Sequence, residues 1–119
     1  MDIKKSKIAI IGLGYVGLPL AIEFGKKYFT IGFDIDNSRV NKLKKYKDET
    51  NEISYKDFKS SSRLSFTSSV NNIKQCSIFI ITVPTPVNSI NAPNLSFLKK
   101  ASELVGSVIK KNSIIIYES

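Results

Sequence analysis

Three glycines, Gly12, Gly14 and Gly17, stand in the spacing G-x-G-x-x-G within the stretch GLGYVG. A turn of this kind can hold a pyrophosphate. The first glycine permits a tight turn, the second leaves room for the phosphates, and the third lets the following helix pack closely. Free N–H groups and the partial positive charge at the start of that helix attract the anion. The pattern alone is weak evidence, and glycines needed only for packing are the alternative.

A carboxylate follows the glycines at the distance expected for a dinucleotide site. Asp34 ends a second apolar run about 20 residues further along the chain. A carboxylate at that place accepts hydrogen bonds from the ribose hydroxyls of adenosine and repels a 2′-phosphate. The pair of motifs therefore predicts NAD rather than NADP as the cofactor. Asp36 is the competing ribose ligand, but it lies past the end of the run and can instead help to start the next helix.

The elements around these motifs have the order that such a site requires. Residues 7–11 form a short, continuous apolar run, which is typical of a strand buried on both faces. From Tyr15 to Tyr28 the apolar residues recur at helical spacing, and residues 29–34 again resemble a strand. The glycines thus lie between a predicted strand and a predicted helix.

The rest of the chain continues the alternation. Further strands are expected at 64–67, 77–83 and 113–117, and helices after a cap at Asn37 or Ser38, through 70–73 and from about 95. Residues 47–62 resemble a polar connection that can contain a short helical turn, and residues 84–94 resemble a proline-rich loop. Strands alternating with helices predict an α/β fold. We expect one Rossmann-like domain over 1–119, a doubly wound, mostly parallel sheet with helices on both faces.

The composition excludes several classes of function. The chain carries a net charge of +8 but has sixteen lysines and only two arginines, so a lysine-rich surface is favoured over a nucleic-acid site. There is no histidine and a single cysteine, Cys76, which excludes a Ser-His-Asp triad within this chain and argues against a metal site. No apolar run has the length of a membrane helix or a signal peptide. A reducing cytoplasm is the expected compartment.

Longer motifs carry a more specific resemblance. The chain resembles the N-terminal, NAD-binding part of the UDP-glucose/GDP-mannose dehydrogenase family, whose members oxidise the C6 hydroxyl of a nucleotide sugar to a carboxylate with two NAD. The matching stretches are IGLGYVGLPLA (11–21), GFDIDNSRV (32–40), ITVPTPVN (81–88), APNL (92–95) and IIIYES (114–119). Within the family it is most similar to the branch acting on UDP-N-acetylhexosamines (the Vi-antigen type), through KDETNEIS (47–54), IKQCSIFIITVPTPVN (73–88) and KKASELVGSVI (99–109).

The resemblance implies a set of cofactor contacts. The pyrophosphate is expected on the turn, and Asp34 is expected on the adenosine ribose. Arg39 is implied near the ribose or adenine, although an exposed helix cation is the alternative. The fourth predicted strand is expected to meet the cofactor at its end, where Thr85 could also be only a turn residue. The expected NAD-binding residues are Gly12, Leu13, Gly14, Tyr15, Val16, Gly17, Asp34, Arg39, Val83, Pro84, Thr85 and Glu118.

The resemblance also implies what this chain lacks. The catalytic cysteine of the family and its lysine and asparagine partners come later in family members, so no catalytic residue or metal ligand is expected here. Cys76 precedes the fourth strand and is expected to be a small buried hydrophobe. We expect the chain to be the N-terminal part of a longer, homo-oligomeric enzyme of surface polysaccharide biosynthesis, which holds its UDP-sugar elsewhere. Alone it should be inactive.

Two other functions remain open at the level of sequence. The chain could be the cofactor domain of another NAD-dependent dehydrogenase, of the 6-phosphogluconate or 3-hydroxyacyl-CoA type. It could also be a non-enzymatic regulator that binds a dinucleotide. The stretch TVPTP after the fourth predicted strand favours the nucleotide-sugar enzymes over the other dehydrogenases. The regulator stays open here, because only the extent of the reading frame would decide between it and a dehydrogenase.

Overall fold

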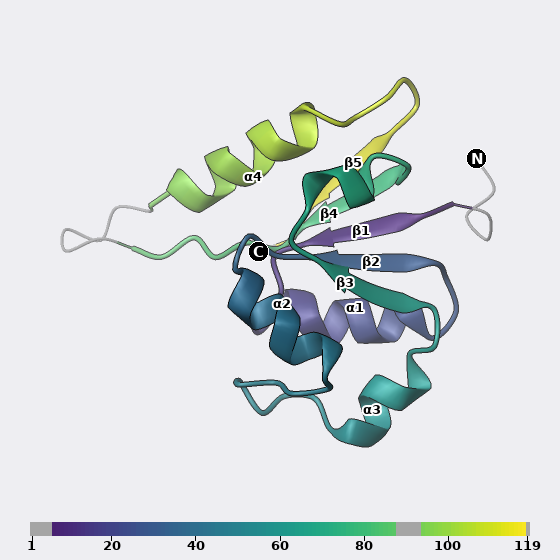
Figure 1. Ribbon diagram of the computed structural model, residues 1–119. Coiled ribbons are helices and arrows are strands. Elements are labelled where there is room, and N and C mark those ends of the chain that lie inside the picture. Colours follow the sequence, from purple (N-terminus) through teal and green to yellow (C-terminus); the bar gives the residue numbers. More distant parts are fainter. Residues whose placement is uncertain (1–5, 88–93, 119) are drawn as a thin grey trace.

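A computed structural model describes residues 6–87 and 94–118 and shows a parallel sheet between two layers of helices (Figure 1). The elements follow in the order β1 (Ile8–Ile11), α1 (Gly17–Gly25), β2 (Thr30–Phe33), α2 (Asn37–Lys44), α3 (Tyr55–Ser60), β3 (Leu64–Thr67), the 3-10 helix η1 (Val70–Ile73), β4 (Ile78–Ile81), α4 (Ser96–Gly106) and β5 (Ile114–Tyr117). The Rossmann-like, doubly wound fold predicted from the alternation is confirmed. Most of the predicted loop 84–94 lies outside the described residues.

The sheet has the strand order β3-β2-β1-β4-β5, and every pair is parallel. The chain runs outward from β1 to β3, then returns to β4 on the other side of β1. The order in which strands are added to the sheet therefore reverses between β1 and β4. In open parallel sheets, ligands bind at the carboxyl ends of the strands beside such a point. The glycine turn follows β1 and the stretch TVPTP follows β4, so both predicted motifs lie at that point.

Side chains that alternate along the strands build one core on each face of the sheet. One cluster joins Ala9, Ile11, Phe79 and Ile81 to α4, and the other joins Ile8, Ile10, Ile78 and Ile80 to α1, α2 and α3. Figure 1 shows α4 on the opposite side of the sheet from α1. The strands between the two layers therefore need apolar residues in succession, as the run at 7–11 predicted.

The structure shows how the two helices between β2 and β3 begin. The second helix is capped by Asp36, whose carboxylate accepts from the Arg39 N–H at 3.2 Å, and not by Asn37 or Ser38. The polar connection 47–62 contains α3, which begins with a reciprocal capping box between Ser54 and Asp57. Side-chain acceptors at these starts satisfy backbone donors that the helix leaves free.

Candidate functional site

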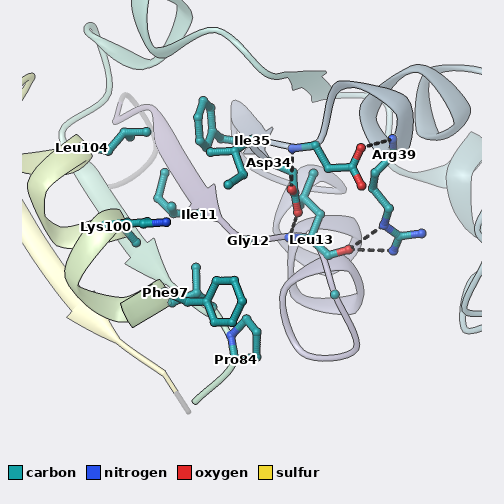
Figure 2. Close-up of a pocket in the computed structure, with 15 residues that line it drawn as sticks. Ile11, Gly12, Leu13, Asp34, Ile35, Arg39, Pro84, Phe97, Lys100 and Leu104 are labelled. Carbon is teal, nitrogen blue, oxygen red and sulfur yellow. Dashed lines mark hydrogen bonds between the residues drawn. The ribbon is translucent and has the colours of Figure 1, made fainter. Parts of the chain in front are cut away.

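A cavity of about 490 Å³ opens at the carboxyl ends of β1, β2 and β4. One wall is the glycine turn, a second is the stretch from Phe33 to Arg39, and a third is formed by one face of α4, from Phe97 to Leu104, with Val83 and Pro84. Figure 2 shows Phe97, Lys100 and Leu104 of α4 across the cavity from Asp34 and Ile35. The size is within the range of small-molecule and cofactor pockets.

The three glycines of the turn meet three different requirements. Gly12 has φ of +100°, a backbone conformation that side chains other than hydrogen disfavour. A Cβ on Gly17 would lie 1.7 Å from the Gly12 carbonyl oxygen, so the helix can approach the turn only without one. A Cβ on Gly14 would meet nothing within 4 Å and would occupy open space beside the cavity. Gly14 is thus not required for packing, which fits a space kept free for a ligand.

The start of α1 is prepared for an anion. Its first residue is Gly17, and the preceding Val16 makes no side-chain capping hydrogen bond. The first N–H groups of a helix have no partner within it, and they carry its positive partial charge. A pyrophosphate placed at this turn would supply the missing acceptors.

Asp34 joins the end of β2 to the glycine turn. Its carboxylate accepts from the Leu13 N–H at 2.9 Å through Oδ2 and from the Asp36 N–H at 2.9 Å through Oδ1. Each carboxylate oxygen can accept more than one hydrogen bond, so both can still receive a ribose hydroxyl. Asp34 therefore both shapes the turn and presents a negative charge to the cavity.

Thr82, which the sequence analysis did not single out, holds the turn from β4. Its buried hydroxyl lies 2.7 Å from the Gly12 carbonyl oxygen and 3.1 Å from that of Ile11, so it can donate to either. The position of Thr82 directly after a buried strand could have indicated this role, because the carboxyl ends of parallel strands lie at the same edge of a sheet.

The structure brings together seven of the twelve expected cofactor residues. The cavity is lined by Gly12, Leu13, Gly14, Asp34, Arg39, Val83 and Pro84. Five expected residues do not line it, namely Tyr15, Val16, Gly17, Thr85 and Glu118. The first three form the helix start, with Tyr15 and Val16 exposed, and the Glu118 N–H donates to the Ile81 carbonyl at 2.9 Å, at the end of β4.

Arg39 lines the cavity, but its guanidinium is turned to the protein. Nε and Nη2 donate to the Leu13 carbonyl at 3.0 and 2.6 Å, and Nη1 donates to Asp48 Oδ1 at 3.0 Å. The side chain is only 11% exposed, so it is not the exposed helix cation that the sequence left open. A direct contact with ribose or adenine stays a prediction.

Asp48 is the acid beneath Arg39, and the sequence analysis missed it. Its side chain is 1% exposed and accepts hydrogen bonds from Arg39, Thr50, Glu52 and Ile53. Burial acts to raise the pKa of this carboxyl, but the hydrogen bonds from Thr50, Arg39 and Glu52 outweigh it and hold the pKa below its usual value. Asp48 is therefore ionised at neutral pH.

Among the described residues, the charged side chains that line the cavity are those of Asp34, Asp36, Arg39 and Lys100. Within residues 6–87 and 94–118 there is no cluster of acidic or thiol side chains able to hold a metal. Cys76 is buried at the far end of β4, and burial raises the pKa of its thiol to about 11. A thiol in that state is a poor nucleophile. The arrangement can hold a dinucleotide, as the sequence predicted.

No helix in those described residues has the length and apolar character needed to cross a bilayer.

Comparison with known proteins identifies what this site resembles. The sequence model of the UDP-glucose/GDP-mannose dehydrogenase family, NAD binding domain, matches residues 6–119. The UDP-N-acetyl-D-glucosamine 6-dehydrogenase of Pseudomonas aeruginosa is 49% identical over 116 residues, 98% of this chain and 28% of that protein. The enzyme of the same name from Salmonella typhi is 49% identical over 117 residues, again 98% and 28%.

A solved structure agrees with both. The UDP-D-ManNAc dehydrogenase of Pyrococcus horikoshii has a TM-score of 0.86 to this chain at 32% identity, covering 95% of this chain and 28% of that one. The chain therefore spans a little over a quarter of the relatives that it matches.

Proposed function

Because the chain belongs to the UDP-glucose/GDP-mannose dehydrogenase family and forms its NAD binding domain, we propose that it supplies the cofactor to a UDP-sugar 6-dehydrogenase. The reaction proposed is oxidation of the C6 hydroxyl of a UDP-N-acetylhexosamine to a carboxylate, with two NAD consumed per sugar. The family match favours this over the 6-phosphogluconate and hydroxyacyl-CoA types and over a regulator. Identities of 49% to two UDP-N-acetyl-D-glucosamine 6-dehydrogenases support the substrate class.

The geometry that carries the proposal is the turn with its acid. The pyrophosphate would lie against the open side of Gly14 and the free start of α1, and the adenosine ribose would lie on Asp34. Val83 and Pro84 at the end of β4 would follow the cofactor toward its nicotinamide end, where Thr85 and Glu118 are also proposed. Ile35, Phe97 and Leu104 offer apolar surface for the flat adenine ring.

NAD contributes the hydride acceptor when bound, and this chain contributes binding and orientation. The residues that would handle the sugar and the thiol needed for the second oxidation belong to a part of the enzyme beyond this chain. All four residues of β5 are exposed, with 37 to 57% of their surface free, which supports further packing partners there. A homo-oligomeric, cytoplasmic enzyme of surface polysaccharide biosynthesis is the setting that we propose.

Activity tests the proposal directly. We expect the longer enzyme that contains this chain to release two NADH per UDP-N-acetylhexosamine, and residues 1–119 alone to release none from UDP-N-acetylglucosamine, UDP-N-acetylgalactosamine or UDP-glucose. Absorbance of NADH measures both. Cys76→Ser should leave the rate within about a few-fold, because the thiol is buried and protonated. Turnover by 1–119, or loss of activity in Cys76→Ser, would place the chemistry in this chain and contradict the proposal.

Asp34 gives the prediction on cofactor choice. Asp34→Ala should weaken NAD by about 1.5–3 kcal/mol, the scale of a hydrogen bond to a charged group. The wild-type protein should bind NADP much more weakly than NAD because the carboxylate repels a 2′-phosphate. Asp36→Ala is the matched control. It removes a carboxylate from the same cavity wall and also removes a helix cap, which should lower the free energy of unfolding by about 1 kcal/mol. The preference for NAD over NADP should remain.

Calorimetric titration with NAD and NADP measures both effects. Equal affinity of the wild-type protein for the two cofactors would rule out Asp34 as the discriminating acid. An Asp34→Ala variant that binds NAD unchanged would show that the ribose lies elsewhere.

A further inference from the structure

The peptide groups around Leu13 are held on both sides. The Leu13 N–H donates to Asp34 at 2.9 Å, and the Gly12 carbonyl of the same peptide lies 2.7 Å from the Thr82 hydroxyl. The next carbonyl, that of Leu13, accepts two hydrogen bonds from Arg39. The orientation of both peptide planes is thus set by the side chains that directly follow β2 and β4 and by Arg39 of α2.

The second of these peptides, Leu13–Gly14, carries the Gly14 N–H opposite the Leu13 carbonyl. In a trans peptide the C=O and the following N–H point in opposite directions, and no cis peptide bond occurs in the described residues. Arg39 draws the Leu13 oxygen toward α2, so the N–H of Gly14 points away from α2. No partner for this N–H exists among residues 6–87 and 94–118. The space beside this residue is open, since a Cβ built on Gly14 would meet nothing within 4 Å.

We propose that Arg39 and Asp48 are positioning residues, which hold the Leu13 carbonyl and so aim the Gly14 N–H at the pyrophosphate. Two N–H donors of Arg39 bind the Leu13 carbonyl, and a third N–H donor of Arg39 binds Asp48. Together these three hydrogen bonds fix the plane of the guanidinium. The proposal rests on NAD binding at the glycine turn, and it needs no contact between Arg39 and the cofactor.

Asp48 is itself fixed by its own segment. Oδ1 accepts from the Thr50 N–H at 3.0 Å and its hydroxyl at 2.7 Å, and Oδ2 accepts from the N–H groups of Glu52 and Ile53 at 2.8 and 3.0 Å. The segment 48–53 therefore folds around this carboxylate, which then presents one face to Arg39. A residue in a polar connection is in this way linked to the cofactor turn, with a single side chain between them.

The neighbouring ion pair supplies a matched control. Lys42 lies on the same helix as Arg39 and pairs with Glu49 of the same segment at 2.8 Å, but both side chains are about half exposed. Lys42→Met removes one positive charge without touching the turn. Arg39→Met removes one positive charge and releases the Leu13 carbonyl. Any general effect of charge on an anionic ligand is therefore the same in the two variants.

The experiment compares ligands with and without a pyrophosphate. Binding of NAD, ADP-ribose and adenosine is measured on the intact protein, by calorimetry for the first two and by NMR titration for adenosine. Arg39→Met should weaken NAD and ADP-ribose by about tenfold or more, the scale of lost hydrogen bonds to a ligand phosphate. Adenosine should stay within about twofold, and Lys42→Met should match the wild type for all three. Asp48→Asn should weaken NAD binding, as Arg39→Met does.

Each other result overturns the proposal. Equal weakening of adenosine would show that Arg39 touches the nucleoside directly, and unchanged ADP-ribose binding would show that the turn needs no such support. Arg39→Lys keeps the charge but cannot make the same three contacts, so NAD binding at the wild-type level would show that charge alone suffices. If Arg39→Met does not fold, Arg39→Lys and Asp48→Asn carry the comparison. A wild-type protein that binds neither NAD nor ADP-ribose refutes the cofactor site itself.

Discussion

Replacing Gly17 by alanine is expected to destabilise the protein strongly, although the change adds one methyl group. That methyl would lie 1.7 Å from the Gly12 oxygen and 2.4 Å from the Thr82 hydroxyl oxygen. The first of these is a backbone atom in the turn, so it cannot rotate away. We expect a loss of about 3 kcal/mol or more in the free energy of unfolding, at the upper end of what overpacking costs. Total stabilities of about 5–15 kcal/mol make this a large fraction.

Gly106 provides the control for this substitution. It also lies in a helix, at the end of α4, and a Cβ there would meet nothing within 4 Å. Gly106→Ala should be neutral or stabilising by up to about 1 kcal/mol, because alanine favours helix and restricts the unfolded chain. Urea unfolding followed by circular dichroism compares the two variants. Equal midpoints for them would contradict the close approach of α1 to the turn.

The features that the sequence predicted well are those encoded by neighbouring residues. Four apolar residues in a row at Ile8–Ile11 and Ile78–Ile81 predict strands buried on both faces, and both are. The turn and Asp34 are recognisable because they are parts of one strand-turn-helix-strand unit. Their residues lie close in sequence, so their spacing alone fixes their relation in space.

The far wall of the site could not be predicted in the same way. Phe97, Lys100 and Leu104 reach the cavity from α4, more than 60 residues after Asp34. Ala101 and Val105 of that helix pack into the core, and they are four residues apart, which is the spacing of one helix face. Spacing identifies the face that meets the sheet, but not which residues beside that face border a cavity. That depends on where the helix lies along the strands.

The Arg39–Asp48 pair shows a second limit. Residues 47–62 carry mostly polar side chains and no clear periodicity, so a solvated connection was the natural interpretation. Asp48 is nonetheless 1% exposed, because hydrogen bonds from its own segment and from Arg39 compensate for the loss of water. Such compensation comes from tertiary contacts, and no single-residue property marks it.

β5 shows the opposite case, an apolar run that is not buried. The residues Ile114–Tyr117 have the composition of an inner strand and form a strand as predicted, which the structure pairs with β4. All four are nevertheless exposed, and none belongs to either core cluster, although the Tyr117 hydroxyl lies 3.1 Å from that of Ser102 on α4. Composition predicts that a strand forms, whereas burial depends on what packs against it.

Gly14→Val is expected to abolish cofactor binding while leaving the fold intact, the reverse of the result at Gly17. The backbone at Gly14 does not have a positive φ, and a Cβ there meets nothing within 4 Å, so we expect the protein to accommodate valine. Its branched side chain would fill the open space beside the free N–H groups, where the pyrophosphate must lie. NAD affinity should fall at least about 100-fold, or 2.7 kcal/mol, because hydrogen bonds to a charged ligand are lost together.

Gly106→Val isolates this effect. It introduces the same side chain at the other glycine for which nothing lies within 4 Å, on α4 but outside the cavity lining. Both variants should unfold at urea concentrations near that of the wild type, and only Gly14→Val should lose NAD. Persistent NAD binding in Gly14→Val would mean that the phosphates do not approach this residue. Unfolding of Gly14→Val would mean that the open space is needed by the protein itself. A selective loss of binding would place the pyrophosphate at the turn on evidence independent of family membership.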